Sequence, residues 1–336
     1  MAGNVFILGA GLSGIYSKMQ NPKSTLIDKS VYLTISTRLV NVVNGDDKNY
    51  AYKLRPVDRN ETVRDIDFAN RLIVTDKGNI PYGKLIIALG HSQEIKTIEG
   101  SQYLHKLETI EDAISMKELI RKSENITIIG GSYLGVELAS IIKGKKVTIL
   151  ESGSRILARG PEGASDYVSE YFKNTGVNII TGFRVSKVTQ SSVFSPDNEI
   201  KSDLTVYAGG ISGNPLIESL GIKSEHSRIV VNRYLQSVDY DDVYACGDSM
   251  KIEDKDFPMT AFIARKSGIV AMKNATGSSI EFSDYKSGNI LSLNGKYILI
   301  RENSFSKSPI NSLIKKYVNG KTEKTLEKLN QIIGNT

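Results

Sequence analysis

The sequence is poor in the residues that carry sulfur and metal chemistry. Its 336 residues include one cysteine, Cys246, three histidines and no tryptophan. A single cysteine cannot form an intramolecular disulfide, a dithiol redox pair or a cysteine-built zinc site. The histidines (His91, His105 and His226) show no metal spacing and no triad partners, so we predict no metal site and assign them no role. If this protein transfers electrons, a group other than sulfur must carry them.

Long apolar runs are also missing. The longest, such as KLIIALG and NITIIGG, fall far short of the ~20 residues that span a bilayer. The N-terminus has no charged stretch or cleavage site before its apolar run, which argues against a signal peptide and favours a cytoplasmic location. The contents of 40% hydrophobic and 24% charged residues are typical of a globular protein, and the length predicts two or three domains.

Positive charge is concentrated at the C-terminus. The net charge is +6, and residues 307–336 supply +4 of it through six lysines and two glutamates. The rest of the chain is nearly neutral, unlike a nucleic-acid-binding domain. We therefore expect no nucleic acid partner.

The N-terminal stretch NVFILGAGLSGIYSKM predicts a buried strand, a glycine turn and a helix, and STLIDKS predicts the next strand. Gly9, Gly11 and Gly14 form the GxGxxG pattern of a dinucleotide-binding turn, in which a pyrophosphate approaches the backbone at a helix N-terminus. Asp28, at the end of the second strand, is placed to accept hydrogen bonds from a ribose diol. The alternative is a glycine-rich turn that binds no ligand.

The same pattern recurs in the middle of the chain. NITIIGGSYLGVELASIIKGKKVTILES again predicts strand, turn, helix and strand, with Gly130, Ser132 and Gly135 in the turn and Glu151 ending the second strand. Ser132 replaces the middle glycine and puts a side chain where the backbone should approach the phosphates. Glu151, with no arginine directly after it, favours NAD over NADP. Two dinucleotide sites in one chain predict hydride transfer.

Five segments in this order, GAGLSG, YGKLIIALG, GGSYLGVE, DLTVYAGG and VYACGD, resemble those of flavoproteins with two dinucleotide-binding domains. Over residues 3–275 the chain resembles the pyridine nucleotide-disulfide oxidoreductase superfamily. Within this superfamily it is most similar to the type II NADH dehydrogenases and their sulfide:quinone reductase relatives. The resemblance implies an α/β fold with two Rossmann-like, glutathione-reductase-type domains, the NAD domain inserted in the FAD domain, plus a small α+β C-terminal domain. The implied ranges are 1–108 and 228–280 for the FAD domain, 109–227 for the NAD(H) domain and 281–336 for the C-terminal domain.

The resemblance also implies FAD as the bound cofactor and NADH as the substrate. The implied FAD contacts are Gly9, Gly11, Gly14, Asp28, the backbone of Val63, Ala88, Gly90, Gly247, Asp248, Thr260 and Ala261. The implied NAD contacts are Gly130, Ser132, Gly135, Glu151, Gly209 and Gly210. In this alignment Asp248 accepts a ribityl hydroxyl and Cys246 is a filler. A helix expected to start at Pro258 points its N-terminus at the flavin pyrimidine.

Glu137 stands where relatives place a glutamate near the flavin and the nicotinamide, which implies that it tunes the flavin or relays a proton. The alternative is a helix-surface residue that pairs with Lys143 or Lys145. The implied reaction is hydride transfer from NADH to flavin, followed by transfer of two electrons to a quinone-like acceptor. Sulfide oxidation and disulfide reduction by the family's routes are excluded because both need cysteines that are absent.

The chain departs from the type II dehydrogenases where these bind their electron acceptor. Both glutamines of the relatives' quinone motif are missing from residues 261–266. Two alternatives therefore stay open: a reductase of a small ferredoxin- or rubredoxin-type carrier, and a slow NADH-binding flavoprotein with a role in signalling or assembly.

The tail is expected to contain two short strands, NILSLN and KYILI, and then two amphipathic helices. The apolar stripe of the first helix is Ile310, Leu313, Ile314, Tyr317 and Val318. Asn319-Gly320 is expected to end it, and Leu326, Leu329 and Ile333 form the second stripe. Such basic helices are compatible with peripheral binding to the cytoplasmic face of an anionic membrane, with attraction of an acidic carrier, with packing on the protein or with a homodimer contact.

Overall fold

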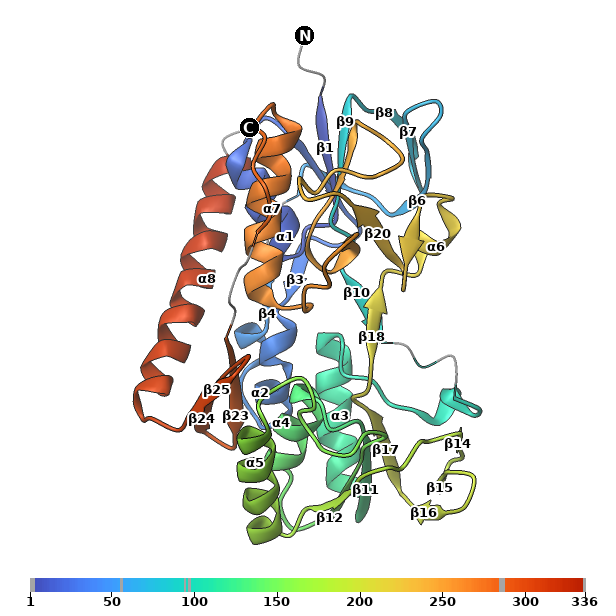
Figure 1. The fold of residues 1–336 in the computed structure, drawn as a ribbon, viewed down its shortest axis with the longest axis vertical. Coiled ribbons are helices and arrows are strands. Elements are labelled where there is room, and N and C mark those ends of the chain that lie inside the picture. The colour runs from blue at the N-terminus through green and yellow to red at the C-terminus, as the bar shows by residue number, and fades with distance from the viewer. Residues whose placement is uncertain (1–3, 55–56, 94, 96–97, 284–287, 335–336) are drawn as a thin grey trace.

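The structure, a computed structural model, describes residues 4–54, 57–93, 95, 98–283 and 288–334. Two parallel sheets lie one above the other in Figure 1, and a long C-terminal helix runs along one side. Further helices and short antiparallel strands surround them, which makes the chain a mixed α/β structure.

The upper sheet carries the N-terminal glycine motif. Its order is β21–β9–β1–β2–β5, and every pair in it is parallel. The strands are β1 (Val5–Leu8), β2 (Thr25–Asp28), β5 (Arg59–Asn60), β9 (Lys84–Ile87) and β21 (Val243–Ala245). Strands β1 and β21 are buried throughout, as expected for apolar parallel strands covered on both faces. Helices α1 (Leu12–Gln20) and α7 (Ala261–Ala275) pack against each other beside this sheet.

The lower sheet carries the second glycine motif. Its order is β13–β12–β11–β17, again all parallel. The elements are β11 (Asn125–Ile129), β12 (Lys146–Leu150), β13 (Asn178–Ile180), β17 (Leu204–Tyr207), α3 (Ile110–Lys122), α4 (Tyr133–Ile141) and α5 (Glu162–Thr175). Because β21 follows this unit in sequence yet pairs with β9, the lower unit is inserted into the upper one.

The two units are linked by short elements. Strand β10 (His91–Gln93), which leaves the upper sheet, pairs antiparallel with β18 (Ile211–Gly213), which returns from the lower one. Helix α2 (Leu39–Val43) comes from the N-terminal part of the sequence but packs on α3 in the core of the lower unit.

The other helical elements are η1 (Ser36–Arg38), η2 (Lys48–Tyr50), η3 (Ser101–Tyr103), α6 (Leu216–Ser219) and η4 (Gly247–Ser249). The other strands are β3 (Tyr32–Thr34), β4 (Tyr52–Leu54), β6 (Val63–Asp67), β7 (Leu72–Thr75), β8 (Gly78–Pro81), β14 (Lys187–Val188), β15 (Ser192–Phe194), β16 (Glu199–Lys201), β19 (Ser224–Glu225), β20 (Arg228–Val231) and β22 (Met250–Ile252).

The C-terminal part differs from the expectation in two ways. It has three antiparallel strands, β23 (Asn289–Leu293), β24 (Lys296–Arg301) and β25 (Ser304–Ser306), instead of two. It has one helix, α8 (Ile310–Gly334), instead of two. The predicted break at Asn319-Gly320 is wrong because tertiary contacts hold the helix there. The buried Arg38 guanidinium donates to the backbone carbonyl of Asn319 (3.3 Å) and to the carboxylate of Glu323 (2.6 Å). The side-chain amide of Asn319 donates to the Tyr50 hydroxyl (2.9 Å).

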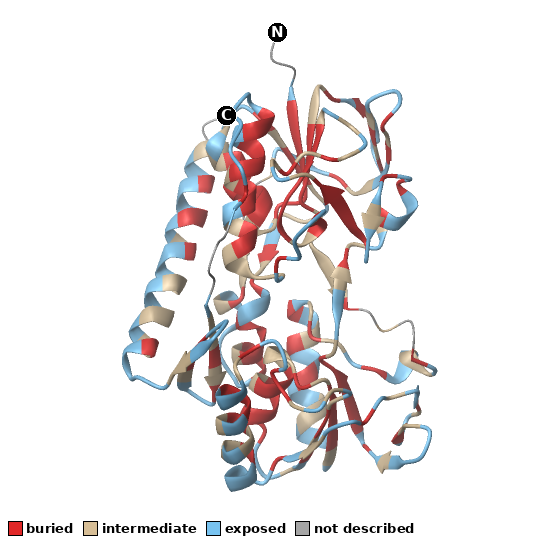
Figure 2. Cartoon of the chain, viewed as in Figure 1, coloured by how far each residue is buried: buried red, intermediate tan, exposed pale blue. Residues whose placement is uncertain are grey.

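The long helix buries one of its two apolar stripes. Leu326 and Leu329 pack with Ile15 and Tyr16 of α1, so the second stripe packs on the protein body. In the first stripe Ile310, Leu313 and Tyr317 are 57%, 61% and 71% exposed. Figure 2 shows buried and exposed residues alternating along this helix. Over the described ranges, no helix combines the length and the apolarity needed to cross a bilayer.

The start of α7 also differs from the expectation. The helix begins at Ala261, three residues after Pro258, because the Thr260 hydroxyl caps it by accepting from the Ile263 amide (3.3 Å). Thr260 and Ala261 are half-buried.

Candidate dinucleotide sites

The first glycine turn packs α1 directly on the ends of β1 and β9. A β-carbon on Gly14 would lie 1.9 Å from the Gly9 carbonyl oxygen, and one on Gly9 would lie 2.3 Å from the Ala88 oxygen. Gly9 also has a φ of +97°, which L-residues with side chains rarely adopt. Gly11, by contrast, has an ordinary φ of −69° and no atom near the position of a β-carbon. The turn therefore needs two glycines for its fold, whereas Gly11 is available for close approach by a ligand.

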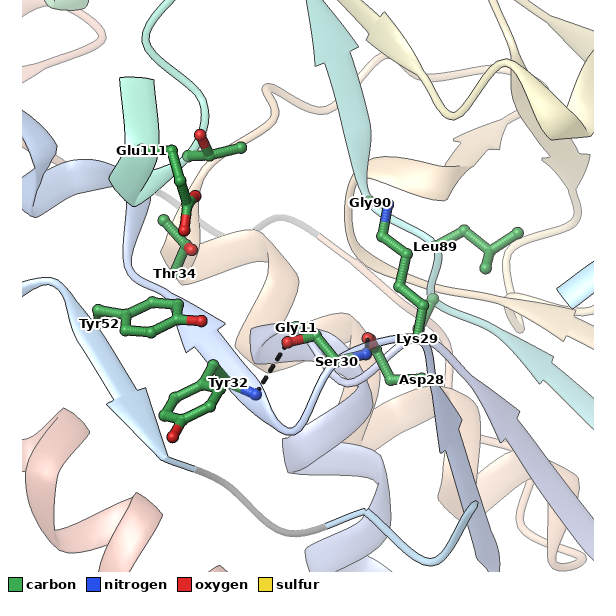
Figure 3. A pocket seen from close by; sticks show the side chains of 13 residues that line it. Gly11, Asp28, Lys29, Ser30, Tyr32, Thr34, Tyr52, Leu89, Gly90 and Glu111 are labelled. Atoms are coloured by element: carbon green, nitrogen blue, oxygen red, sulfur yellow. Dashed lines mark hydrogen bonds between the residues drawn. The ribbon is translucent and has the colours of Figure 1, made fainter. Parts of the chain in front are cut away.

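A cavity of about 350 Å³ opens in front of this turn (Figure 3). The predicted residues that line it are Gly9, Gly11, Asp28, Ala88 and Gly90. The residues that line it without having been predicted are Lys29, Ser30, Tyr32, Thr34, Tyr52, Leu89, Thr109 and Glu111. The rings of Tyr32 and Tyr52 stack with centroids 4.5 Å apart at one side of it. Thr109 and Glu111 belong to the N-terminus of α3, so the cavity lies where the two units meet.

Asp28 uses its carboxylate to hold the turn. One oxygen accepts from the Ala10 amide (2.7 Å), and the other accepts from the Ser30 amide (2.9 Å). The carboxylate thereby joins the end of β2 to the glycine turn and stays at the cavity wall.

The second glycine turn repeats this geometry. A β-carbon on Gly135 would lie 2.1 Å from the Gly130 oxygen, and one on Gly130 would lie 2.4 Å from the Ala208 oxygen. Glu151 accepts from the Gly131 amide (2.8 Å), as Asp28 accepts from Ala10. The two turns are therefore built on the same hydrogen bonds and the same close contacts.

The side chain of Ser132 in this turn is directed toward the protein. Its hydroxyl donates to the Ala208 carbonyl (2.7 Å) and accepts from the Gly135 amide (3.4 Å), which caps α4. Gly209 and Gly210 follow β17 after one residue, Ala208, and the Gly210 amide donates to the Tyr207 hydroxyl (3.1 Å). These contacts bring the sequence-predicted residues of the second site to one sheet edge.

The Gly247-Asp248 pair lies where α1, α7 and β21 meet. Gly247 has a φ of +65°, and its amide donates to the Ser267 hydroxyl of α7 (2.8 Å). The Asp248 Oδ2 lies 2.7 Å from Nδ1 of His91, while its Oδ1 is buried and has no hydrogen-bond partner among the described residues. A buried carboxylate oxygen without a partner is costly, and a ligand hydroxyl would satisfy it. Together with the glycine turn, this oxygen fits the sugar-phosphate portion of a flavin nucleotide.

Cys246 has no reactive environment. It is fully buried, and burial raises the pKa of its thiol to about 12. Since the thiolate is the nucleophilic form, this cysteine fills space in the core.

Val63 is separated from the cavity. It lies on β6, where it pairs with Thr75 and packs at the edge of the upper core, and it does not line the cavity. Gly14, Gly247, Asp248, Thr260 and Ala261 do not line this cavity either. Gly247 nevertheless lies against α1, because a β-carbon on it would come 2.5 Å from the Ser13 hydroxyl.

Glu137 faces the C-terminal sheet. Its Oε1 accepts from the Ser292 amide of β23 (2.8 Å). The positive charge of Lys315 on α8 acts to lower the pKa of this carboxyl. Burial raises the pKa of the Glu137 carboxyl to about 7, against the weaker lowering effects of Lys315 and the Ser292 amide. The alternative pairing with Lys145 is wrong, because Lys145 pairs with Glu124 (2.7 Å).

We expect Glu137→Gln to stabilise the protein at pH 8 and to leave its stability unchanged near pH 4. The folded-state pKa of about 7 exceeds the ordinary 4.5, so ionised Glu137 lowers the stability of the wild type progressively as pH rises between these values. The expected gain at pH 8 is about 2 kcal/mol, allowing for partial exposure. Thermal unfolding of both proteins at several pH values measures it, and a gain equal at both pH values would contradict the assignment.

The chain is similar to known proteins over the part that contains both glycine turns. The family model "Pyridine nucleotide-disulphide oxidoreductase" matches residues 3–268. The NADH dehydrogenase-like protein YutJ of Bacillus subtilis is 25% identical over 243 residues, which cover 67% of this chain and 68% of that protein. The demethylphylloquinone reductase NdbB of Synechocystis sp. is 24% identical over 294 residues, which cover 74% of this chain and 72% of the relative.

Among solved structures, NDH2 of Plasmodium falciparum in complex with NADH has a similar fold. The TM-score is 0.84 at 16% identity, and the match covers 99% of this chain and 98% of the other. The predicted fold class, α/β with two dinucleotide-binding domains, is confirmed.

Proposed function

Because the chain belongs to the pyridine nucleotide-disulphide oxidoreductase family, we propose that it takes a hydride from NADH and passes two electrons to a quinone-like acceptor. The chain is an NAD(P)H-dependent flavoprotein oxidoreductase by its family, with FAD as cofactor and NADH as substrate. The observation that carries the proposal is the repeated turn, with an acidic side chain on each turn amide. FAD, when bound, supplies the two-electron chemistry that the side chains of this protein lack.

In this proposal the upper unit holds FAD. Gly11 would allow close approach of the pyrophosphate, and Asp28 would lie at the ribose. Asp248 would accept a ribityl hydroxyl at Oδ1, which has no hydrogen-bond partner in the part of the chain that the structure describes. Helix α7, capped at Thr260, directs the positive end of its dipole at the flavin pyrimidine, which favours negative charge there. The remaining residues proposed for the FAD site are Gly9, Gly14, Val63, Ala88, Gly90, Gly247 and Ala261.

The lower unit is proposed to bind NADH. Its residues are Gly130, Ser132, Gly135, Glu151, Gly209 and Gly210. Glu137, on the helix that starts at this turn, stays the proposed candidate for tuning the flavin or relaying a proton, with its carboxylate held by the Ser292 amide of β23.

We expect NADH to be used at least about tenfold more efficiently than NADPH. The Glu151 carboxylate would repel a 2′-phosphate, and Arg155, four positions further on, donates to the carbonyls of Leu157, Ala158 and Gly160. Stopped-flow reduction rates with both nucleotides measure the preference, and Glu151→Gln should narrow it. Equal efficiencies in the wild type would contradict this assignment.

The identity of the electron acceptor is tested by reoxidation of the reduced flavin. The NADH-reduced protein should regain its flavin absorbance when mixed anaerobically with a soluble quinone analogue. If quinones fail while an acidic ferredoxin-type carrier succeeds, with a rate that falls steeply as salt is added, the carrier alternative replaces the quinone. The exposed lysines of α8, Lys316, Lys321, Lys324 and Lys328, are the observation that favours this second candidate. A reduced complex that neither acceptor reoxidises would favour the slow signalling or assembly role.

We further propose that the exposed stripe of α8 brings the protein to an anionic membrane, where quinones dissolve. Ile310, Leu313 and Tyr317 share one helix face with exposed lysines, and each well-placed lysine adds about 1 kcal/mol of attraction. Leu313→Glu should at least halve co-sedimentation with vesicles of phosphatidylcholine and phosphatidylserine. The matched control is Ile114→Glu on α3, also an exposed apolar residue (49%), which should bind as the wild type does. Equal binding by both variants, or none by the wild type, would contradict membrane docking.

A further inference from the structure

His91 is the first residue after the cavity-lining Gly90 and opens β10. Its ring Nδ1 lies 2.7 Å from the Asp248 Oδ2, a hydrogen-bond distance, although 157 residues separate the two in sequence. The side chains of His91 and Asp248 are 30% and 17% exposed, so the pair is mostly shielded from water.

The two carboxylate oxygens of Asp248 differ in their hydrogen bonding. Oδ2 is held by His91, and Oδ1 is buried without a partner among the described residues. The backbone beside it is held by Gly247, whose amide donates to the Ser267 hydroxyl, but this contact does not involve the side chain of Asp248. The His91 ring is thus what determines which carboxylate oxygen is turned toward the ligand side.

We propose that His91 is the positioning residue of Asp248: by donating from Nδ1 to Oδ2, it keeps Oδ1 directed at the ribityl chain of FAD. This inference rests on the proposed function, because it assumes that Asp248 binds the cofactor. His91 is not a catalytic residue in this account, since it acts through Asp248.

The charges around His91 set the pH range of this effect. The hydrogen bond to Asp248 on η4 is the main reason that the pKa of His91 lies above its usual 6.5. Burial of the ring lowers this pKa, and the negative charge of Glu108, which precedes α3, raises it further. Strand β18, which pairs with β10, presents Gly213 and Ser212 there and no titratable group. The charged pair therefore exists at lower pH and is lost as pH rises through the raised pKa.

The test is the affinity of the apoprotein for FAD, measured by quenching of flavin fluorescence from pH 6 to pH 9. We expect His91→Ala to bind FAD about tenfold more weakly than the wild type at pH 6, the loss typical of a hydrogen bond to a charged group. His91→Asn, whose amide can reach the position of Nδ1, should recover most of the affinity. The wild type should bind more weakly at pH 9 than at pH 6, and neither variant should show this pH dependence.

The melting temperature of each apoprotein shows whether the variants fold. If folded His91→Ala binds FAD as tightly as the wild type and keeps its pH dependence, the positioning role is wrong. If Asp248→Ala loses FAD while His91→Ala does not, only this inference fails. If the wild type itself does not bind FAD, the proposed function fails.

Discussion

Asp248→Ala is expected to purify without flavin and to bind added FAD at least about a hundredfold more weakly than the wild type. Removing the carboxylate takes away the partner of a ligand hydroxyl and leaves the half-buried His91 without its hydrogen bond, and losses of this kind are large. The measurement is flavin absorbance after purification, followed by titration of the apoprotein with FAD.

Asp254→Ala is the matched control, because Asp254 is an exposed aspartate on the turn that follows. This control should keep its flavin. If Asp248→Ala retains FAD at wild-type affinity, Asp248 does not face the ribityl chain and the assignment of this segment is wrong.

Gly14→Ala should impair both folding and FAD binding, whereas Gly11→Ala should impair FAD binding and leave the fold largely intact. At Gly14 the added methyl group would sit 1.9 Å from the Gly9 carbonyl oxygen, a backbone atom that can move only with the turn. We expect Gly14→Ala to destabilise the apoprotein by about 3 kcal/mol and to abolish FAD binding. At Gly11 no atom obstructs the methyl group, but glycine is preferred to alanine at this helix N-cap, so the apoprotein should lose no more than about 1 kcal/mol of stability.

The informative result is the behaviour of Gly11→Ala toward FAD. Its methyl group would project into the cavity, where a pyrophosphate is proposed to approach the backbone, so FAD affinity should fall at least about tenfold. Thermal unfolding of the apoproteins and titration with FAD separate the two effects. Wild-type FAD affinity in Gly11→Ala would place the pyrophosphate elsewhere.

Local patterns explain why both glycine turns were predictable. The residues that build each turn lie within a short stretch, and their spacing alone specifies strand, turn and helix. The sequence also located Asp28 and Glu151 at strand ends. It did not show that each carboxylate holds a turn amide, because this depends on how the ends of two neighbouring strands lie in space.

Long-range contacts account for what the sequence did not reveal. The helix α8 continues through Asn319-Gly320 because Arg38 and Tyr50, from the other end of the chain, bind its backbone and side chains. The pairing of His91 with Asp248 likewise joins distant segments, so His91 carried no signal in the sequence. The cavity wall formed by Tyr32 and Tyr52 was missed for the same reason.

Anaerobic titration of the FAD-reconstituted protein with NADH, followed by visible absorbance, tests whether this chain is an NADH-oxidising flavoprotein. We predict one FAD per chain and complete bleaching of the flavin by one equivalent of NADH, since one site of each kind is proposed. Failure to bind FAD, or a bound flavin that NADH does not bleach, would contradict it.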